Sequence, residues 1–575
     1  MATEAELSKT AESPVLASGS LALEIGAIAM RDPQAAAHAA DGAARASGRP
    51  AVVTARGIAD VLRVASGLVT ASGDRKPVIA VLQLSDTERE VALPAIETAS
   101  RSTLIVEPGE SADRLAERCN ESLQLSAPVS LVLNRDSDLA SVVKAVAANC
   151  AIRESVDSQA EVGGSVDLKP AFEALREAKK PVILLGSGAL STTALESIAA
   201  LARLWQAPVC LTFSATSMAA DTLDRCLALF GADIPLLPAG TVPWTNALTR
   251  ADHLLALGSG LSEADWFGLS DAKLVRAPVT RVALNPGKDG IADRTVDVDA
   301  GDFAKAFAAE IVRGGALTRD NWVERFSEAR SKWSGLVDEE AHRAGDSDRL
   351  SAPLAAREIV SAAPANAILV GEGGAAGMWL ASYAWLRPLI VPSQHASIGA
   401  SIPMAAGAAL AEPARPIWAV VGDGAFFYCA RELAGLAERG VPIAVFVFDD
   451  RSWNAIRLVQ TLFFRHRTIG TDLPEVDYRS HAELHGCETI RVRTPSDLAQ
   501  ALSLAQEPRN KPLVVDIRVD KGSIPFVGAN LILAELDGAL GPLAGSAALG
   551  GLLAAAKDRP ALAATLRVTA GALRK

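Results

Sequence analysis

The chain has 575 residues, too many for one hydrophobic core, so its length predicts three or four domains. Hydrophobic residues make up 49% and charged residues 21%, the balance of an ordinary globular protein. The net charge of −11, without a basic stripe, argues against a nucleic-acid partner.

The termini and cysteines point to a protein of the cytoplasm. The start, "MATEAELSKTAESP", has no basic region followed by an apolar one, so no secretory signal is evident. No run of about 18 apolar residues occurs, which excludes a predicted membrane span. Six scattered cysteines without a C-x-x-C pair favour free thiols in a reducing compartment over disulfides or a metal site.

Short apolar runs alternate with alanine-rich amphipathic stretches along the chain. "PAVVTA", "KPVILLGSG" and "VPIAVFVFDD" are examples of the runs, which predict parallel strands buried on both faces. The scheme recurs three times, with polar breaks at 155–167 and 338–350. We therefore predict an α/β protein of three doubly wound parallel-sheet domains with a helical C-terminal tail. The predicted units are 17–152, 166–325, 351–527 and 528–575.

In the third unit, two apolar runs end in acidic residues. "RPIWAVVGDG" carries Asp423 between two glycines, and "VPIAVFVFDD" ends in Asp449 and Asp450. Parallel sheets bind ligands beyond the carboxyl ends of their strands, and the N-terminus of the helix expected after Asp423 suits a phosphate. Carboxylates beside a phosphate need a divalent cation between them, so the pattern predicts a magnesium-bridged diphosphate. Taken singly, G-D-G is usually only a turn and an Asp pair a helix cap.

The whole constellation resembles the thiamine-diphosphate-dependent enzymes of the acetolactate synthase, benzoylformate decarboxylase and pyruvate decarboxylase superfamily. Their signature is G-D-G, then Asn-Asn after a second strand; this chain has Gly422-Asp423-Gly424, then "FDDRSWNAIR". "SIGASIPMAAGAALAEPARP", "AAAHAADGAARASGRPAVV" and "KKPVILLGSGALSTTALESIAALARLW" are similar to other family segments. The resemblance covers most of residues 20–527. It implies pyrimidine-binding, central and diphosphate-binding domains, in that order.

The resemblance also implies roles for individual residues. Asp423 and Asp450 would ligate magnesium, with the main-chain carbonyl of Ser452 as third protein ligand. Ile398 would hold the two cofactor rings in a V shape, although an ordinary core residue is the plainer explanation. The implied cofactor contacts are Gly422, Gly424, Ala425, Phe426, Ile398 and Glu372.

Two departures from the family pattern stand out. Asp449-Asp450 replaces Asn-Asn, and we expect cofactor binding to persist with a stronger dependence on metal. Pro33 stands where the family has a Glu that hydrogen-bonds the pyrimidine and assists removal of the C2 proton. Asp32 would point to the opposite face if the segment is a strand end, and Glu24 is too far along the chain.

Other family features of the first domain are also absent, so its pyrimidine-binding half looks damaged. Three explanations remain open: an enzyme that works without the Glu, as the glyoxylate carboligase branch does; a paralogous partner subunit that supplies it; or a non-catalytic homologue. His395 and His38 are candidate catalytic residues that could move protons, with a structural role as the alternative for His38.

The expected activity is therefore thiamine-diphosphate- and Mg²⁺-dependent decarboxylation or carboligation, acting on a 2-oxoacid or aldehyde. The resemblance implies a homodimer or homotetramer, because family sites form between subunits. The glycine turns at 186–188 and 258–260 leave FAD or a CoA-type nucleotide in the central domain undecided.

Overall fold

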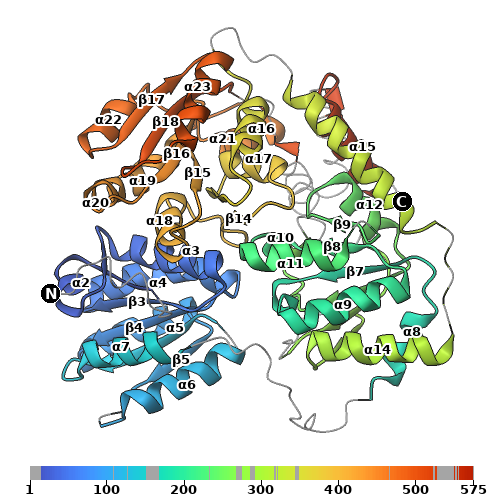
Figure 1. The fold of residues 1–575 in the computed structure, drawn as a ribbon, viewed down its shortest axis with the longest axis horizontal. Coiled ribbons are helices and arrows are strands. Elements are labelled where there is room, and N and C mark those ends of the chain that lie inside the picture. Colours follow the sequence, from blue (N-terminus) through green and yellow to red (C-terminus); the bar gives the residue numbers. More distant parts are fainter. Residues whose placement is uncertain are drawn as a thin grey trace.

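The computed structural model describes residues 14–573 except 108, 126, 151–166, 232, 267–274, 285–291, 316, 318, 320, 343–348, 465–466, 522, 524, 527–549, 551–552 and 555. These residues form three α/β domains, each built on a six-stranded parallel sheet with helices on its faces (Figure 1). Within the described ranges, no helix is both long and apolar enough to cross a membrane.

The N-terminal sheet has the strand order β2-β1-β3-β4-β6-β5. Its strands are β1 (Val15–Ser18), β2 (Ile28–Met30), β3 (Ala51–Arg56), β4 (Val78–Leu84), β5 (Ser102–Ile105) and β6 (Val129–Asn134). Its helices are α2 (Gly19–Ile25), α3 (Pro33–Ser47), α4 (Ile58–Gly73), α5 (Asp86–Ala99), α6 (Ala112–Leu125) and α7 (Leu139–Asn149). The sequence changes that suggested damage therefore leave a complete sheet, with every residue of β4 buried.

The central sheet has the order β12-β11-β10-β7-β8-β9. Its strands are β7 (Pro181–Leu185), β8 (Val209–Leu211), β9 (Leu236–Leu237), β10 (His253–Leu257), β11 (Val279–Val282) and β12 (Arg294–Val296). The helices around it are α8 (Lys169–Arg176), α9 (Thr192–Trp205), α10 (Phe213–Thr216), α11 (Ala220–Phe230), α12 (Val242–Arg250), α13 (Glu263–Trp266) and α14 (Ala300–Gly314), with a short 3₁₀ turn, η1 (Ser187–Ala189).

Helix α15 (Glu324–Ala341) follows the central domain and enters the stretch 338–350, which we had expected to be a polar linker. The apolar side of α15 explains this difference, because Phe326, Trp333 and Val337 are buried against neighbouring helices. Residues 343–348 of that stretch lie outside the described part.

The C-terminal sheet has the order β14-β13-β15-β16-β18-β17. Its strands are β13 (Ile368–Gly371), β14 (Leu389–Ile390), β15 (Ile417–Gly422), β16 (Ile443–Asp449), β17 (Glu488–Val492) and β18 (Leu513–Arg518). Its helices are α16 (Ala352–Ala362), α17 (Ala375–Tyr383), α18 (Ser401–Ala411), α19 (Asp423–Cys429), α20 (Glu432–Glu438), α21 (Asn454–Phe463), α22 (Tyr478–Leu484) and α23 (Pro495–Gln506).

The N-terminal and C-terminal domains join through α3 and α18, which lie side by side in Figure 1. Both helices are rich in alanine and glycine, which lets their backbones approach closely. A Cβ atom at Gly42 would lie 2.2 Å from the carbonyl oxygen of Met404, and one at Gly407 would lie 1.8 Å from that of Ala39. The two domains consequently share one apolar core.

The described part of the tail includes a helix that packs on the body. Helix α26 (Pro560–Leu573) contacts α12 and α15 and buries Leu562 and Leu566. The carboxylate of Glu340 accepts hydrogen bonds from the N–H groups of Ala561 and Leu562 and thereby caps the helix.

Candidate active site

A cavity of about 270 Å³ lies at the carboxyl ends of β13, β15 and β16; we call it the diphosphate cavity. Most of the residues singled out in the sequence line it, although they come from four separate segments. They are Glu372, Ile398, Gly422, Asp423, Gly424, Ala425, Asp450 and Ser452. Sequence reasoning missed the apolar walls, which include Met378, Trp379 and Trp453 and carry no chemical signature.

Asp423 and Asp450 form the acidic centre of the cavity. Asp423 accepts hydrogen bonds from the N–H groups of Gly424 (2.7 Å) and Ser452 (3.3 Å). Burial and the charge of Asp449 raise the pKa of Asp423 to about 7, and burial and Asp423 raise the pKa of Asp450 well above its usual range. Within the described residues, Asp450 Oδ1 is buried without a hydrogen-bond partner. This oxygen donor set of two buried carboxylates fits a divalent metal ion.

Asp449 has a different role from its neighbour. Its carboxylate pairs with Arg518 at 3.0 Å, and its backbone carbonyl accepts a hydrogen bond from Arg349. It does not line the diphosphate cavity. Of the two aspartates that replace Asn-Asn, only Asp450 therefore lines the cavity, while Asp449 acts on Asp423 through its charge.

The backbone around Asp423 leaves room for an anion. Helix α19 begins at Asp423, and its N-cap residue Gly422 has no side chain to cap the helix. A Cβ atom at Gly424 would lie 2.7 Å from the ring of Trp453, so only glycine fits there. Phe426 does not line the cavity, because its ring is buried edge-on against Tyr478. It could reach a ligand only through its backbone.

Glu372 holds the loop that carries Ile398. Its buried carboxylate accepts hydrogen bonds from the N–H groups of Gly399 (3.1 Å), Ala400 (3.3 Å) and Ser401 (3.4 Å), and from the Ser401 hydroxyl. Burial raises the pKa of Glu372, whereas these hydrogen bonds favour its ionised form. Ile398 itself remains 43% exposed beside the cavity.

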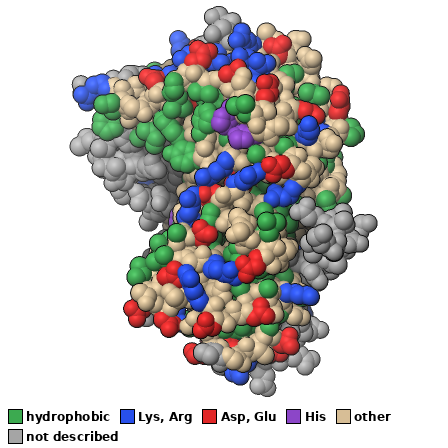
Figure 2. All heavy atoms as spheres, turned by 90° about the vertical axis from the view of Figure 1, so that its left-hand side faces the viewer, with side chains coloured by type: hydrophobic (Ala, Val, Ile, Leu, Met, Phe, Trp, Pro, Cys, Tyr) green, Lys and Arg blue, Asp and Glu red, His purple; other side chains and the backbone are tan. Residues whose placement is uncertain are grey.

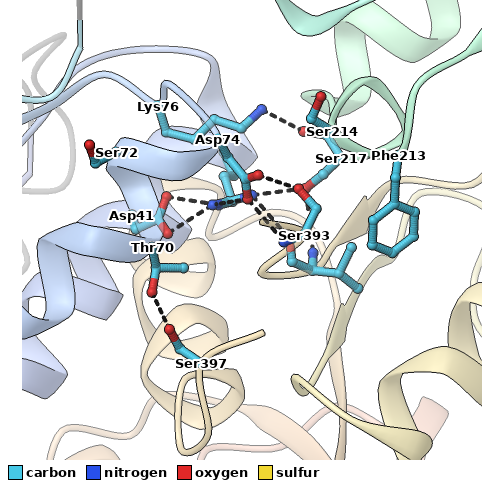
Figure 3. A network of polar contacts seen from close by, with 12 residues as sticks. Asp41, Thr70, Ser72, Asp74, Lys76, Phe213, Ser214, Ser217, Ser393 and Ser397 are labelled. Atoms are coloured by element: carbon cyan, nitrogen blue, oxygen red, sulfur yellow. Dashed lines mark hydrogen bonds and ion pairs between the residues drawn. The ribbon is translucent and has the colours of Figure 1, made fainter. Parts of the chain in front are cut away.

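The N-terminal and central domains also contact the loop that carries Ile398 (Figure 3). Ser393 donates to Asp74 through its backbone N–H and its hydroxyl, and the hydroxyls of Thr70 and Ser397 lie 2.5 Å apart. Asp74 in turn pairs with buried Arg45 at 2.8 Å. These contacts fix the loop against α3 and α4.

Further bonds extend this network to the central domain. Arg45 also pairs with Asp41 and donates to the carbonyl of Val391, and Lys76 donates to the carbonyl of Ser217 (Figure 3). All three domains therefore contribute to the position of the loop that ends at the cavity.

Comparison with known proteins identifies the architecture around this cavity. The N-terminal TPP binding domain of thiamine pyrophosphate enzymes matches residues 7–99, the central domain matches 168–310, and the C-terminal TPP binding domain matches 372–517. The chain belongs to the thiamine pyrophosphate enzyme family. It is a thiamine pyrophosphate-dependent enzyme by this membership.

Named relatives cover nearly the whole chain at low identity. A "probable acetolactate synthase large subunit" of Methanocaldococcus jannaschii is 24% identical over 521 residues, covering 87% of this chain and 86% of the relative. The acetolactate synthase of Mycobacterium leprae is 26% identical, covering 89% and 84%. The sulfoacetaldehyde acetyltransferase of Rhodobacter capsulatus is 26% identical, covering 84% and 86%.

The structure does not bring the two predicted catalytic histidines to the cavity lining. His38 is buried in α3, and its ring nitrogens have no hydrogen-bond partner in the described part. Burial and the charge of Arg45 lower its pKa to about 4, so it is neutral at physiological pH. His395 is exposed and lies over Gly73, where a Cβ atom would come within 2.7 Å of its ring.

The segment that lacks the family Glu is a helix start. Pro33 is the first residue of α3, and Asp32 is its N-cap, accepting hydrogen bonds from Gln34 N (2.8 Å) and Ala35 N (3.3 Å). Asp32 also contacts Arg63 and Arg431. Strand β2 ends at Met30, so Asp32 and Pro33 follow a strand end and start a helix, as a proline at the first helical position favours. The carboxylate is nevertheless fully engaged, and among the described residues none of the N-terminal domain lines the cavity.

Proposed function

We propose that this enzyme makes or breaks a carbon–carbon bond of a 2-oxoacid, with thiamine diphosphate and Mg²⁺ in the diphosphate cavity. The observation that carries the proposal is the buried pair of Asp423 and Asp450 at the carboxyl end of a parallel sheet, where Asp450 Oδ1 has no hydrogen-bond partner among the described residues. Thiamine diphosphate supplies a nucleophilic carbon when bound. Decarboxylation and carboligation both use that carbon.

The residues would divide the work by position. Asp423, Asp450 and the carbonyl of Ser452 would hold the metal, and the backbone from Gly422 to Phe426 would face the diphosphate. Ile398 would support the rings of the cofactor, and Glu372 would fix the loop on which Ile398 stands. The apolar walls would exclude water from the reacting carbon.

Proton transfer is the step for which the described residues provide the fewest candidate groups. His395 lies on the same loop as Ile398 and stays a proposed proton carrier, whereas the burial of His38 argues for a structural role. Our first explanation remains a slow or specialised enzyme that works without the family Glu at the position of Pro33. A paralogous subunit that supplies the carboxylate is the second.

Assembly as a homodimer or homotetramer would complete the cavity. The described lining comes only from residues 352–519, and Ile398 and Ile456 at its rim are 43% and 55% exposed. Phe427 and Tyr428 add exposed aromatic surface on α19, the helix that begins at Asp423. Figure 2 shows hydrophobic side chains gathered beside histidines on the upper half of one face. Apolar surface of this kind is typical of an interface.

The deciding experiment is calorimetric titration of the purified protein with thiamine diphosphate, with and without Mg²⁺. We expect saturable binding that is lost when the metal is removed by a chelator. Absence of binding in the presence of Mg²⁺ would reject the proposal. The absorbance spectrum of the same sample tests the open question of FAD, and a location in the cytoplasm stays a prediction from the sequence.

A further inference from the structure

A second cavity, of about 460 Å³, lies at the amino end of the central sheet; it is lined by α12, α15 and the residue before β7. Its charged lining residues are Lys180, Arg250 and Arg325, and we call it the basic pocket. It shares no lining residue with the diphosphate cavity, which opens at the carboxyl end of a different sheet. Nothing in the proposed reaction uses it.

Three cations meet in the basic pocket without an acidic residue in its lining. In the described part of the chain, none of the three forms an ion pair. Asp252 lies near Lys180, but its two carboxylate oxygens accept the backbone N–H groups of Lys179 (2.9 Å) and Lys180 (2.8 Å). Asp252 is the acidic group near one end of the pocket, and the lining itself holds three cations in a chain of net charge −11.

The needs of folding do not account for all three cations. Arg250 is in the last turn of α12, where a cation interacts favourably with the helix dipole. Arg325 is the second residue of α15, where the same dipole disfavours a cation. Lys180 precedes β7, and all three cationic side chains are exposed. An anion between the three side chains would stabilise all of them.

The remaining lining can bind the rest of a small molecule. Trp322 and Phe326 form a buried edge-to-face pair with ring centroids 4.9 Å apart, and Trp322 is fixed by a hydrogen bond from its indole N–H to the carbonyl of Pro181. Asn246 lines the pocket and makes no side-chain hydrogen bond within the described residues. The volume lies in the range of small-molecule sites, roughly 300–1,000 Å³.

We propose that the basic pocket binds a phosphorylated small molecule of nucleotide size. Its phosphates would lie between Lys180, Arg250 and Arg325, because guanidinium groups match phosphate oxygens in pairs. Its apolar part would lie on Trp322 and Phe326. The pocket is an effector or carrier site separate from the reaction centre.

Titration of the full-length protein with ATP tests this proposal. Thiamine diphosphate and Mg²⁺ are kept saturating so that ATP is excluded from the diphosphate cavity. We expect one ATP site whose affinity falls at least tenfold in the double variant Arg250→Gln with Arg325→Gln, and falls as salt rises. The variant Lys332→Ala removes an exposed charge of α15 outside the pocket, and its affinity should stay within twofold.

Competition titrations with inorganic phosphate and with ADP separate the possible sources of the anion. Competition by phosphate supports a site for the phosphate group itself, whereas competition by ADP but not by phosphate supports a nucleotide site. The proposal is overturned if neither ATP nor phosphate binds at millimolar concentration. It is also overturned if ATP binds equally well to the double variant, whose folding is checked by its melting temperature.

Discussion

Asp423 and Ser452 join the ends of two strands, since Asp423 Oδ2 accepts a hydrogen bond of 3.3 Å from the Ser452 N–H. Asp423 follows β15 and Ser452 follows β16, and the two residues are 29 positions apart. This hydrogen bond therefore holds the proposed metal ligands in a fixed arrangement without help from a ligand. A site prepared in this way loses little entropy when it binds its ligand.

The first prediction concerns the acidic pair. Asp423→Ala should abolish binding of thiamine diphosphate in the presence of Mg²⁺, because the variant loses one of two metal-binding carboxylates. The protein should stay folded, since removal of the repulsion between Asp423 and Asp450 offsets part of the loss of the hydrogen bonds from Gly424 and Ser452. Asp450→Asn is the matched control and should keep cofactor binding with a metal affinity reduced only several-fold. Unchanged affinity in Asp423→Ala would remove Asp423 from the site.

The second prediction concerns Glu372. Glu372→Ala leaves buried N–H groups of Gly399, Ala400 and Ser401 unpartnered, at about 1–3 kcal/mol for each group. We expect a marked loss of thermal stability and of cofactor affinity, measured by calorimetry. Glu372→Gln keeps an acceptor oxygen and should show a smaller loss of both. If the two variants behave alike, the carboxylate has a charge-dependent role that exceeds loop positioning.

The third prediction concerns Pro33. If the missing carboxylate limits the reaction, exchange of the C2 proton of bound cofactor, followed by NMR in deuterated water, should be slow in wild type. General acid–base assistance typically contributes a factor of about 10² to 10⁴, and Pro33→Glu should recover part of it. Recovery should be partial because the new side chain must begin a helix beside Asp32, Arg63 and Arg431. Fast exchange in wild type would point to another group, with His395 the first to replace.

The fourth prediction concerns assembly. Ile456→Asp places a charge at the exposed rim of the diphosphate cavity and should convert a dimer or tetramer to monomer in sedimentation velocity at micromolar concentration. Val312→Asp is the control, because Val312 is also exposed (66%) but lies on α14 of the central domain. A wild-type protein that is monomeric and still binds cofactor would contradict an intersubunit site.

The fifth prediction concerns His38 and pH. Its pKa is about 4 in the folded protein, below the ordinary histidine value of 6.5, so between pH 6.5 and 4 the unfolded chain binds a proton that the folded protein does not. Its contribution should therefore lower stability as pH falls from 6.5 to 4, by up to about 3 kcal/mol. His38→Leu should lessen that loss in melting temperature and leave cofactor binding intact. Loss of proton exchange at C2 in this variant would instead restore His38 as a catalytic residue.

The sequence predicts the fold well because fully buried parallel strands leave continuous apolar runs. The run from Ile443 to Asp449 is such a strand, and the acidic residues at its end lie where the topology requires. Local pattern does not reveal which member of an Asp pair faces a ligand. Asp449 turns away because Arg518, 69 positions later, supplies its counter-charge.

Other features of the site depend on contacts that no local pattern encodes. The loop before Ile398 is held by Asp74 and Thr70 from a different domain. The N-terminal domain also keeps its sheet although its family motifs are lost, because burial of β3 and β4 requires only apolar residues of suitable size. Glu372 could be placed by resemblance, but its bonds to Gly399 and Ser401 could not.

Arg559 supports the wall of the diphosphate cavity, and it is translated after all three sheets. Its guanidinium lies 5.7 Å from the centre of the Trp379 ring, and it also pairs with Glu340, whose carboxylate caps α26. Trp379 is part of the cavity wall. While the ribosome is still translating, all three sheets can form before this wall has its outer support. The cavity wall therefore gains this contact only after the residues of all three sheets have been translated.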